Sequence, residues 1–202
     1  MDEKQRACAP SSLILVCYFT PIRQALGGSE SMQATIETNR LTLRPFTEFD
    51  ATRVAELAGE KIISDMTASI PHPYELTDAV DWIRTHQDLF NTGKGVVYAL
   101  VLKNSNTLIG AVSFPRIEEG EGTLGYWLGV PFWGAGYATE SSRALIEYAK
   151  ENLGLSKLKV IHLIENERSK SVISKLGATY VGTKTIQAQG REREVCVYTA
   201  RL

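Results

Sequence analysis

The sequence predicts one folded domain of mixed α and β structure, with a mostly antiparallel central sheet and helices on both faces. Three observations carry this prediction. From residue 36 onward, strand-like runs interchange with segments of helical periodicity. Three consecutive strand patterns are joined by short turns, which makes them antiparallel neighbours. A later strand pattern follows a helical segment, so that strand must run parallel to its neighbour.

Length and composition agree with a single hydrophobic core. The chain has 202 residues, of which 44% are hydrophobic and 22% charged, and its formal net charge is -1. A net charge so close to zero does not favour binding to a nucleic acid. The three cysteines (Cys8, Cys17 and Cys196) show no metal-ligand spacing, and their odd number fits a reducing compartment. We therefore expect a cytoplasmic protein without a metal site.

Residues 1–31 are expected to form an N-terminal extension outside the fold, and residues 32–202 the folded domain. The apolar run at residues 12–19 is far too short to span a bilayer, so no membrane association is expected. Residues 1–6 lack the net positive charge of a secretion signal, which remains the alternative interpretation of this segment. Met32 is an alternative start of the protein.

The first half of the domain is expected to hold one strand and two helices. Residues 36–44 alternate between apolar and polar, as in a half-buried strand. Thr47 is expected to cap a helix that ends at Gly59, and residues 64–74 are expected to be irregular because prolines interrupt them. A second helix is expected to begin at Thr77. The stripes expected on these helices are Phe49, Val54, Leu57 and Ala58, then Val80, Ile83, Gln87 and Phe90, with Trp82 and His86 beside the second stripe.

The second half is expected to begin with a three-stranded meander at residues 96–102, 108–114 and 123–130. After Pro131 the periodicity becomes helical, and Gly154 ends this long helix. The remaining elements are a strand at residues 158–164, a short helix at 167–176 that Gly177 ends, and a closing hairpin of residues 179–186 and 193–201.

The most informative segment is the turn between the meander and the long helix. Gly134 and Gly136 lack a β-carbon, so an anion can approach the backbone closely. The helix that follows adds unpaired N–H groups and partial positive charge. A pyrophosphate site is one interpretation, and a tight turn without a ligand is the other. Neither a P-loop nor a dinucleotide-binding fold is indicated, because the Walker-type lysine is missing and Thr139 occupies the third glycine position.

Around this turn the sequence resembles the GNAT superfamily of acetyltransferases, in particular its ribosomal-protein N-terminal acetyltransferases. The matching runs occur in the family's order and at its spacing, and they cover residues 36–202. They are residues 38–45 (TNRLTLRP), 125–128 (GYWL), 133–140 (WGAGYATE), 166–169 (NERS) and 175–178 (KLGA).

The resemblance implies that two parallel strands, at residues 123–130 and 158–164, splay apart to hold acyl-CoA. The pantetheine arm would pair with the first of these strands, and the pyrophosphate would lie on the amides of residues 134–138. The cofactor-binding residues implied in this way are Leu128, Val130, Trp133, Gly134, Ala135, Gly136, Tyr137, Ala138, Thr139, Asn166 and Ser169.

Two positions depart from the family's pattern. Pro131 stands where members usually carry Gln or Arg, so phosphate binding is expected to depend on main-chain amides. Ile173 stands where many members carry the tyrosine that acts as a general acid. That catalytic role is therefore vacant or has moved to another residue.

Acetyl transfer to an amine needs a neutral amine, aligned reactants and a thiolate that is protonated or tolerated. Ser169 is our candidate to hydrogen-bond or protonate the thiolate; alternatively, Asn166 and Ser169 only begin and cap a helix. Glu121 is the candidate base, acting through water, or else a charged turn residue. Glu140 either complements the helix dipole or takes part in catalysis. The other glutamates considered as bases are Glu118, Glu119 and Glu165.

Several further side chains have two interpretations. His162, in an apolar strand, is expected to be structural rather than a base. His72 and Tyr74 either contact an acceptor or belong to a rigid surface turn. The tryptophans are expected to pack rather than to stack on a cofactor, and they are Trp82, Trp127 and Trp133.

We therefore expect an acetyl-CoA-dependent N-acetyltransferase in which a primary amine attacks the thioester directly. The acceptor is a protein N-terminus or a small-molecule amine, and the protein is a monomer or a homodimer. One alternative is a non-catalytic acyl-CoA-binding regulatory module on the same fold. The other is an unrelated α/β protein whose glycine turn is only structural.

Overall fold

One sheet of eight strands forms the centre of residues 32–202, the part of the chain that the structure, a computed structural model, describes. The expected extension at residues 1–31, with Cys8 and Cys17, lies outside the described residues. The strand order is β1-β2-β3-β4-β5-β6-β8-β7, and among the described strands only β5 and β6 pair in parallel, as predicted. The strands are β1 (Ile36–Glu37), β2 (Leu41–Arg44), β3 (Val96–Leu102), β4 (Thr107–Glu118), β5 (Glu121–Leu128), β6 (Lys157–Leu163), β7 (Thr179–Ala188) and β8 (Arg191–Arg201).

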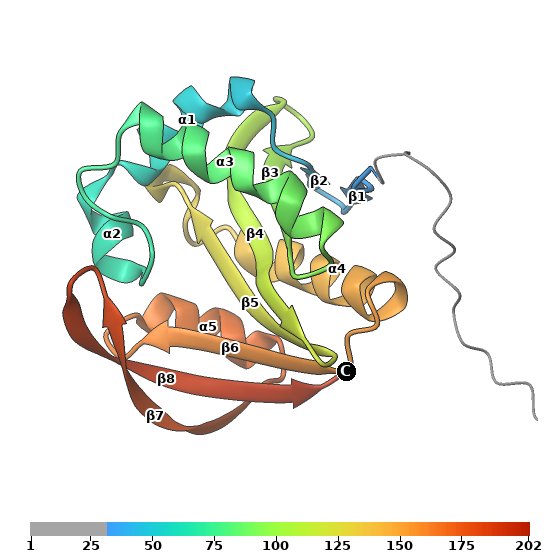
Figure 1. Cartoon of the computed structure of the whole chain (residues 1–202), viewed down its shortest axis with the longest axis vertical. Coiled ribbons are helices and arrows are strands. Elements are labelled where there is room, and N and C mark those ends of the chain that lie inside the picture. The colour runs from blue at the N-terminus through green and yellow to red at the C-terminus, as the bar shows by residue number, and fades with distance from the viewer. Residues whose placement is uncertain (1–31) are drawn as a thin grey trace, which may run out of the picture. The chain divides into compact units, whose positions relative to one another are not determined.

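Helices cover both faces of this sheet (Figure 1). They are α1 (Ala51–Ala58), α2 (Lys61–Met66), α3 (Leu76–Asn91), α4 (Tyr137–Asn152) and α5 (Glu167–Lys175), with the 3₁₀ turns η1 (Glu48–Asp50) and η2 (Val130–Phe132). Helices α1 and α3 pack on the face that carries Ala99 and Val101, whereas Tyr98 and Leu100 belong to the core under α4 and α5. Alternate residues of β3 thus enter two cores, which explains an apolar run on both faces. Within residues 32–202, no helix is long and apolar enough to cross a bilayer.

The parallel pair in the middle of the sheet is joined only at one end. Glu121 to Leu124 of β5 lie opposite Lys157 to Val160 of β6. Beyond Leu124, β5 pairs only with β4, and β6 pairs only with β8. The two strands diverge from there, and α2 lies across their open end (Figure 1). The predicted splayed pair is therefore confirmed, and it leaves one backbone edge of β5 free to receive an added strand.

The expected single strand over residues 36–44 is wrong, because the chain reverses in its middle. Strands β1 and β2 are antiparallel neighbours, with Ile36 opposite Leu43. The Thr38 N–H donates to the Leu41 carbonyl at 2.9 Å, and the Thr38 hydroxyl accepts from the Leu41 N–H. This side-chain bond lets a polar residue close a tight turn, which alternation alone does not reveal.

The first expected helix is correct at both ends but not in its first turn. Thr47 forms a capping box, and α1 ends at Gly59, as predicted. Residues 48–50 form the 3₁₀ turn η1, which winds more tightly than an α-helix. Phe49 is consequently rotated away from Val54 and Leu57, and it is 97% exposed instead of buried.

The buried stripe of α3 lies one residue from the expected one. Its buried members are Ala79, Ile83 and His86, whereas Gln87 is exposed. The expected stripe placed Gln87 where the structure buries His86; both side chains are polar and both fit a helical period, so the packing of α3 decides between them. In addition, α2 extends to Met66, so the beginning of the segment expected to be irregular is helical.

Candidate functional site

A cavity of about 900 Å³ opens where β5 and β6 separate. Its walls come from these two strands, the turn before α4, helix α5, the segment after α2 and one face of α3. Glu121, Val130 and Ala135 are not among the residues that line it. The residues proposed from the sequence that do line it are Leu128, Trp133, Gly134, Gly136, Tyr137, Ala138, Thr139, Asn166 and Ser169.

The turn before α4 presents unpaired amide groups. Gly134 and Gly136 have φ values of 77° and 84°, in the left-handed region that favours glycine. A β-carbon at Gly134 would meet no atom within 4 Å, so its surroundings are open. The first bond of the helix runs from the Glu140 N–H to the Gly136 carbonyl, and within the described residues the amides of residues 137–139 have no acceptor. A helix N-terminus of this kind can bind phosphate.

The side chain of Arg40 anchors this turn. One guanidinium nitrogen donates to the Ala135 carbonyl at 2.9 Å, and Nε donates to Glu140 at 2.7 Å. Glu140 also accepts from the Thr38 hydroxyl at 2.7 Å and from the Arg40 N–H at 2.9 Å. Burial would raise the pKa of Glu140, but these hydrogen bonds hold it below its usual value. The carboxylate of Glu140 is thus occupied in holding the turn, and it does not line the cavity.

A cationic side chain also reaches the turn, from α5. The Arg168 guanidinium lies 4.6 Å from the ring centroid of Trp133, whose indole N–H donates to the Leu128 carbonyl at 2.7 Å. Arg168 and Lys175 both line the cavity. Pro131 had suggested that this turn has no basic side chain at hand. Only the packing of α5 beside the turn reveals Arg168, because its position in the sequence is remote from it.

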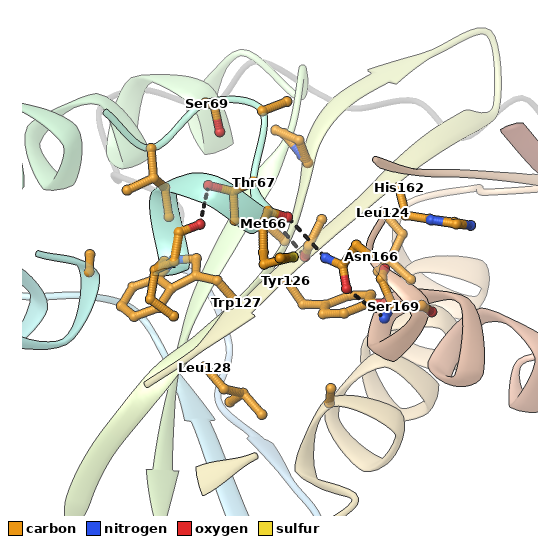
Figure 2. Close-up of a pocket in the computed structure, with 18 of the residues that line it drawn as sticks. Met66, Thr67, Ser69, Leu124, Tyr126, Trp127, Leu128, His162, Asn166 and Ser169 are labelled. Carbon is orange, nitrogen blue, oxygen red and sulfur yellow. Dashed lines mark hydrogen bonds between the residues drawn. The ribbon is translucent and has the colours of Figure 1, made fainter. Parts of the chain in front are cut away.

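Tyr126 and Ser169 face each other inside the cavity, where their hydroxyl oxygens are 2.7 Å apart (Figure 2). Burial raises the pKa of Tyr126 to about 12, against the opposing effect of its hydrogen bond with Ser169. The phenol therefore keeps its proton at neutral pH. Tyr126 was not among the sequence candidates, although it lies in the GYWL run. Sequence patterns do not reveal this pairing, because Ser169 on α5 lies 43 residues from Tyr126 in the sequence.

Asn166 connects α5 to the C-terminal end of α2. Its side-chain carbonyl accepts from the Ser169 N–H at 3.0 Å, and its amide donates to the Met66 carbonyl at 2.9 Å (Figure 2). Gln189 of the β7–β8 hairpin holds the end of α2 and the residues after it, because its amide donates to the carbonyls of Ser64, Thr67 and Ile70. The side chain of Asn166 thus caps the helix and also positions one wall of the cavity.

None of the glutamates considered as bases lines the cavity. Glu121 lies where β5 and β6 are still paired, and its carboxylate is 3.8 Å from Lys159 Nζ. Glu165 forms an ion pair with Arg193, and Glu118 forms one with Arg116 at 2.6 Å. The lining carboxylates are instead Asp78 and Asp81 of α3.

The remaining candidate residues differ in whether they line the cavity. His162 is buried and lines the cavity, but its Nδ1 is 2.8 Å from the Leu163 carbonyl and its Nε2 is 3.4 Å from the Tyr198 hydroxyl. Tyr74 lines the cavity, whereas His72 does not. Ile173, at the position of the family's tyrosine, is fully buried in the core. The three tryptophans all line the cavity, and Trp82 also packs edge-on against Phe46 with ring centroids 5.1 Å apart.

A splayed parallel pair beside a glycine turn with unpaired amides is the arrangement expected of an acyl-CoA-binding fold. The family model for the acetyltransferase (GNAT) domain matches residues 40–179. The chain therefore belongs to the GNAT acetyltransferase family, and it is an N-acetyltransferase with acetyl-CoA as donor.

Individual relatives agree with this assignment. The chain is 27% identical over 166 residues to an uncharacterized N-acetyltransferase, p20, of Bacillus licheniformis, covering 81% of this chain and 93% of that protein. Its fold matches RimL, a ribosomal L7/L12 α-N-protein acetyltransferase solved with coenzyme A, with a TM-score of 0.75 at 20% identity over 84% and 98% of the two chains. It also matches the microcin C7 self-immunity acetyltransferase MccE, solved with acetyl-CoA and AMP, with a TM-score of 0.74 at 21% identity over 82% and 94%.

Proposed function

We propose that this protein acetylates a primary amine, with acetyl-CoA lying in the cavity between β5 and β6. One observation carries the proposal: a single cavity runs from the glycine turn, past Tyr126 and Ser169, to the face of α3. It thus offers an anion-binding end, a proton donor and a separate acceptor region in one continuous space. Turnover requires these three parts to adjoin.

The cofactor residues named from the sequence fit this arrangement with two adjustments. The unpaired amides of residues 137–139 would hold the pyrophosphate, assisted by Arg168. The free edge of β5 beyond Leu124 would pair with the pantetheine arm. The Leu128 carbonyl already accepts from Trp133, so this pairing would use other backbone groups. Ala135 would contribute through the Arg40 anchor.

Ser169 would supply the proton that the departing sulfur needs. The amine nitrogen forms the new bond to the acetyl carbon, the carbon–sulfur bond breaks, and the Ser169 hydroxyl donates its proton to the sulfur. Tyr126, 2.7 Å away, would return a proton to Ser169. The amine loses its proton to water, and water in turn returns a proton to Tyr126. Tyr126 is suited to this task because its raised pKa keeps it protonated at neutral pH.

Two observations support the second candidate, a non-catalytic acyl-CoA-binding module. Ile173 occupies the position of the family's tyrosine, and none of the glutamates in residues 32–202 lines the cavity. The family assignment favours the enzyme, and an amine that is partly neutral in solution needs no strong base. An α-amino group, with a pKa of about 7.7–8.0, meets this condition. A protein N-terminus or a small amine remains the proposed acceptor, with a cytoplasmic location and a monomeric or homodimeric state as accompanying expectations.

The test combines binding with turnover. Calorimetry measures acetyl-CoA affinity, and release of free CoA is followed with a panel of amines and of peptides that begin with Ala or Ser. Ser169→Ala should lower kcat by about 100-fold while leaving acetyl-CoA affinity nearly unchanged. Ser174→Ala is the matched control, since this exposed serine of α5 bonds only the Lys170 carbonyl of its own helix. Binding without turnover on any amine would favour the non-catalytic module, and no binding would overturn both.

A further inference from the structure

The wall of the cavity formed by residues 66–71 is held by hydrogen bonds more than by core packing. It begins at the C-terminal end of α2 and runs toward α3, and each of these residues lines the cavity. Within the described chain, no residue of α2 or of this wall belongs to either of the two hydrophobic cores. The position of the wall therefore depends on polar groups that reach it from other elements.

Gln189 bonds both the end of α2 and the wall. Its side-chain amide donates to the carbonyls of Ser64, Thr67 and Ile70, at 3.0, 3.2 and 2.7 Å. An amide has two hydrogens, so one of them is shared between two carbonyls. Ser64 lies in the last turn of α2 and Thr67 is its C-cap, where a helix leaves carbonyls without partners. One side chain thus ties the helix end to the chain that follows it.

Two further side chains complete this attachment. Arg193 of β8 donates to the Asp65 carbonyl at 2.9 Å, and Asn166 donates to the Met66 carbonyl at 2.9 Å. With the bonds described above, all four carbonyls of residues 64–67 accept from side chains that follow β6 in the sequence. The wall is consequently attached to the C-terminal part of the sheet and to α5.

The backbone of Gln189 indicates that the turn alone does not account for this residue. Ala188 pairs with Arg191, so Gln189 and Gly190 form the two-residue turn of the β7–β8 hairpin. Their φ values are 53° and 73°, both in the left-handed region. Asn-Gly and Asp-Gly are the usual sequences of such turns, because their first residues tolerate this backbone. The turn does not favour glutamine, whereas the longer side chain reaches the wall.

The wall adjoins the region where an acceptor would bind. None of residues 66–71 is among those proposed to bind the cofactor. Asn166, which bonds the Met66 carbonyl, also accepts from the Ser169 N–H at 3.0 Å, so the wall is one side chain from Ser169 (Figure 2). In the other direction the chain continues to α3, which lines the proposed acceptor region. A displaced wall would therefore alter this region and leave the amides of residues 137–139 in place.

We propose that Gln189 is a positioning residue for the acceptor amine. It does not line the cavity, and it acts by fixing residues 66–71 so that the acceptor is held beside Ser169. Loss of its donor weakens acceptor binding and leaves acetyl-CoA binding unchanged. The inference rests on the proposed acetyl transfer, because it assigns this wall to the acceptor.

The test removes the donor while nearly keeping the size of the side chain. Gln189→Met has a similar length and no donor, whereas Gln189→Lys supplies an ammonium group that can donate to carbonyls at a helix end. All three side chains carry a β-carbon, so the backbone cost of the turn is the same. Gln187→Met is the matched control, because Gln187 is exposed on β7 and, within the described residues, its amide bonds only Glu192, at 3.4 Å.

Steady-state CoA release gives kcat and KM with whichever amine or peptide of the panel above is turned over fastest, and calorimetry gives the Kd for acetyl-CoA. In Gln189→Met the acceptor KM should rise roughly tenfold, the size expected for about one net hydrogen bond. Its kcat and its Kd for acetyl-CoA should stay within about twofold. Gln189→Lys should recover most of the loss, and Gln187→Met should change none of these values.

Hydrogen exchange gives a readout that needs no acceptor. The amides of residues 64–71 should exchange roughly tenfold faster in Gln189→Met than in the parent protein, because the wall opens more often, and Gln187→Met should leave them unchanged.

Three results would overturn the inference. An unchanged acceptor KM in Gln189→Met shows that acceptor binding does not depend on this donor. An equal loss of acetyl-CoA affinity shows that the residue supports the whole cavity or the fold. A Gln189→Lys variant as impaired as Gln189→Met shows that the effect does not come from the donor. If no amine is acetylated, the inference falls together with the proposed function, and the exchange measurement separates this outcome from a failure of Gln189 to hold the wall.

Discussion

Replacement of Gly134 by glutamate tests the proposed phosphate-binding role of the glycine turn directly. A side chain there would project into open space, because an added β-carbon meets no atom within 4 Å. Its carboxylate would therefore reach the region over the unpaired amides of residues 137–139. Two unit charges 4 Å apart repel by about 1 kcal/mol in water and by about 4 kcal/mol at an effective dielectric constant of 20. Because about 1.4 kcal/mol corresponds to tenfold, the Kd for acetyl-CoA should rise by roughly 100-fold or more against the two pyrophosphate charges.

The same substitution also strains the backbone, so its controls must separate strain from charge. Gly134 has φ 77°, and a residue with a β-carbon in the left-handed region costs about 1–2 kcal/mol. That cost lowers the Tm by roughly 2–8 °C for a domain of this size. Gly154→Glu carries the same strain at φ 67°, also in open space but away from the cavity, and should lower the Tm without changing affinity. Gly134→Gln keeps the bulk without the charge and should retain part of the binding.

Isothermal titration calorimetry gives the Kd for acetyl-CoA in each variant, and a thermal melt gives the Tm. The placement of the pyrophosphate is refuted if Gly134→Glu binds acetyl-CoA with unchanged affinity. It is equally refuted if Gly154→Glu loses as much affinity, since the effect would then follow from strain and not from the charge at the turn.

Three further predictions concern the residues around the site. Tyr126→Phe should lower kcat by about tenfold with little change in KM, measured by CoA release, because the hydroxyl 2.7 Å from Ser169 is removed while the ring stays; an unchanged kcat would leave Ser169 without its proton source. Arg40→Ala should weaken acetyl-CoA binding and lower stability by about 1–3 kcal/mol, measured by calorimetry and urea unfolding, because it frees both the Ala135 carbonyl and Glu140; Arg116→Ala, which removes only an exposed ion pair with Glu118, is its control. His86 should make stability fall between about pH 6.5 and pH 4, because burial lowers its folded pKa to about 4 and the unfolded chain takes up the proton first; urea unfolding of His86→Leu across this range should show a flatter pH dependence, and an equal slope would contradict the burial argument.

Sequence periodicity was sufficient to predict most of the fold because it reflects which side chains are buried. The run at residues 96–102 is apolar at every position because its alternate side chains enter different cores, and that is visible without coordinates. Phe49 shows the limit of such reasoning. Whether the turn after Thr47 winds as an α-helix or a 3₁₀ helix depends on packing, and this decides which way the ring points.

The glycine turn and the pair of Tyr126 and Ser169 differ in the same way. By itself the sequence determined the turn at residues 133–137, since local glycines and a helix start suffice to present amides there. It also determined the parallel pair, because a helix between two strands forces it. Only the tertiary structure decided that Tyr126 meets Ser169, that Arg40 and Arg168 serve the turn, and that Asp81 rather than Glu121 reaches the cavity. Such contacts join residues far apart in the chain, and their formation depends on how helices pack across the sheet, which no local spacing encodes.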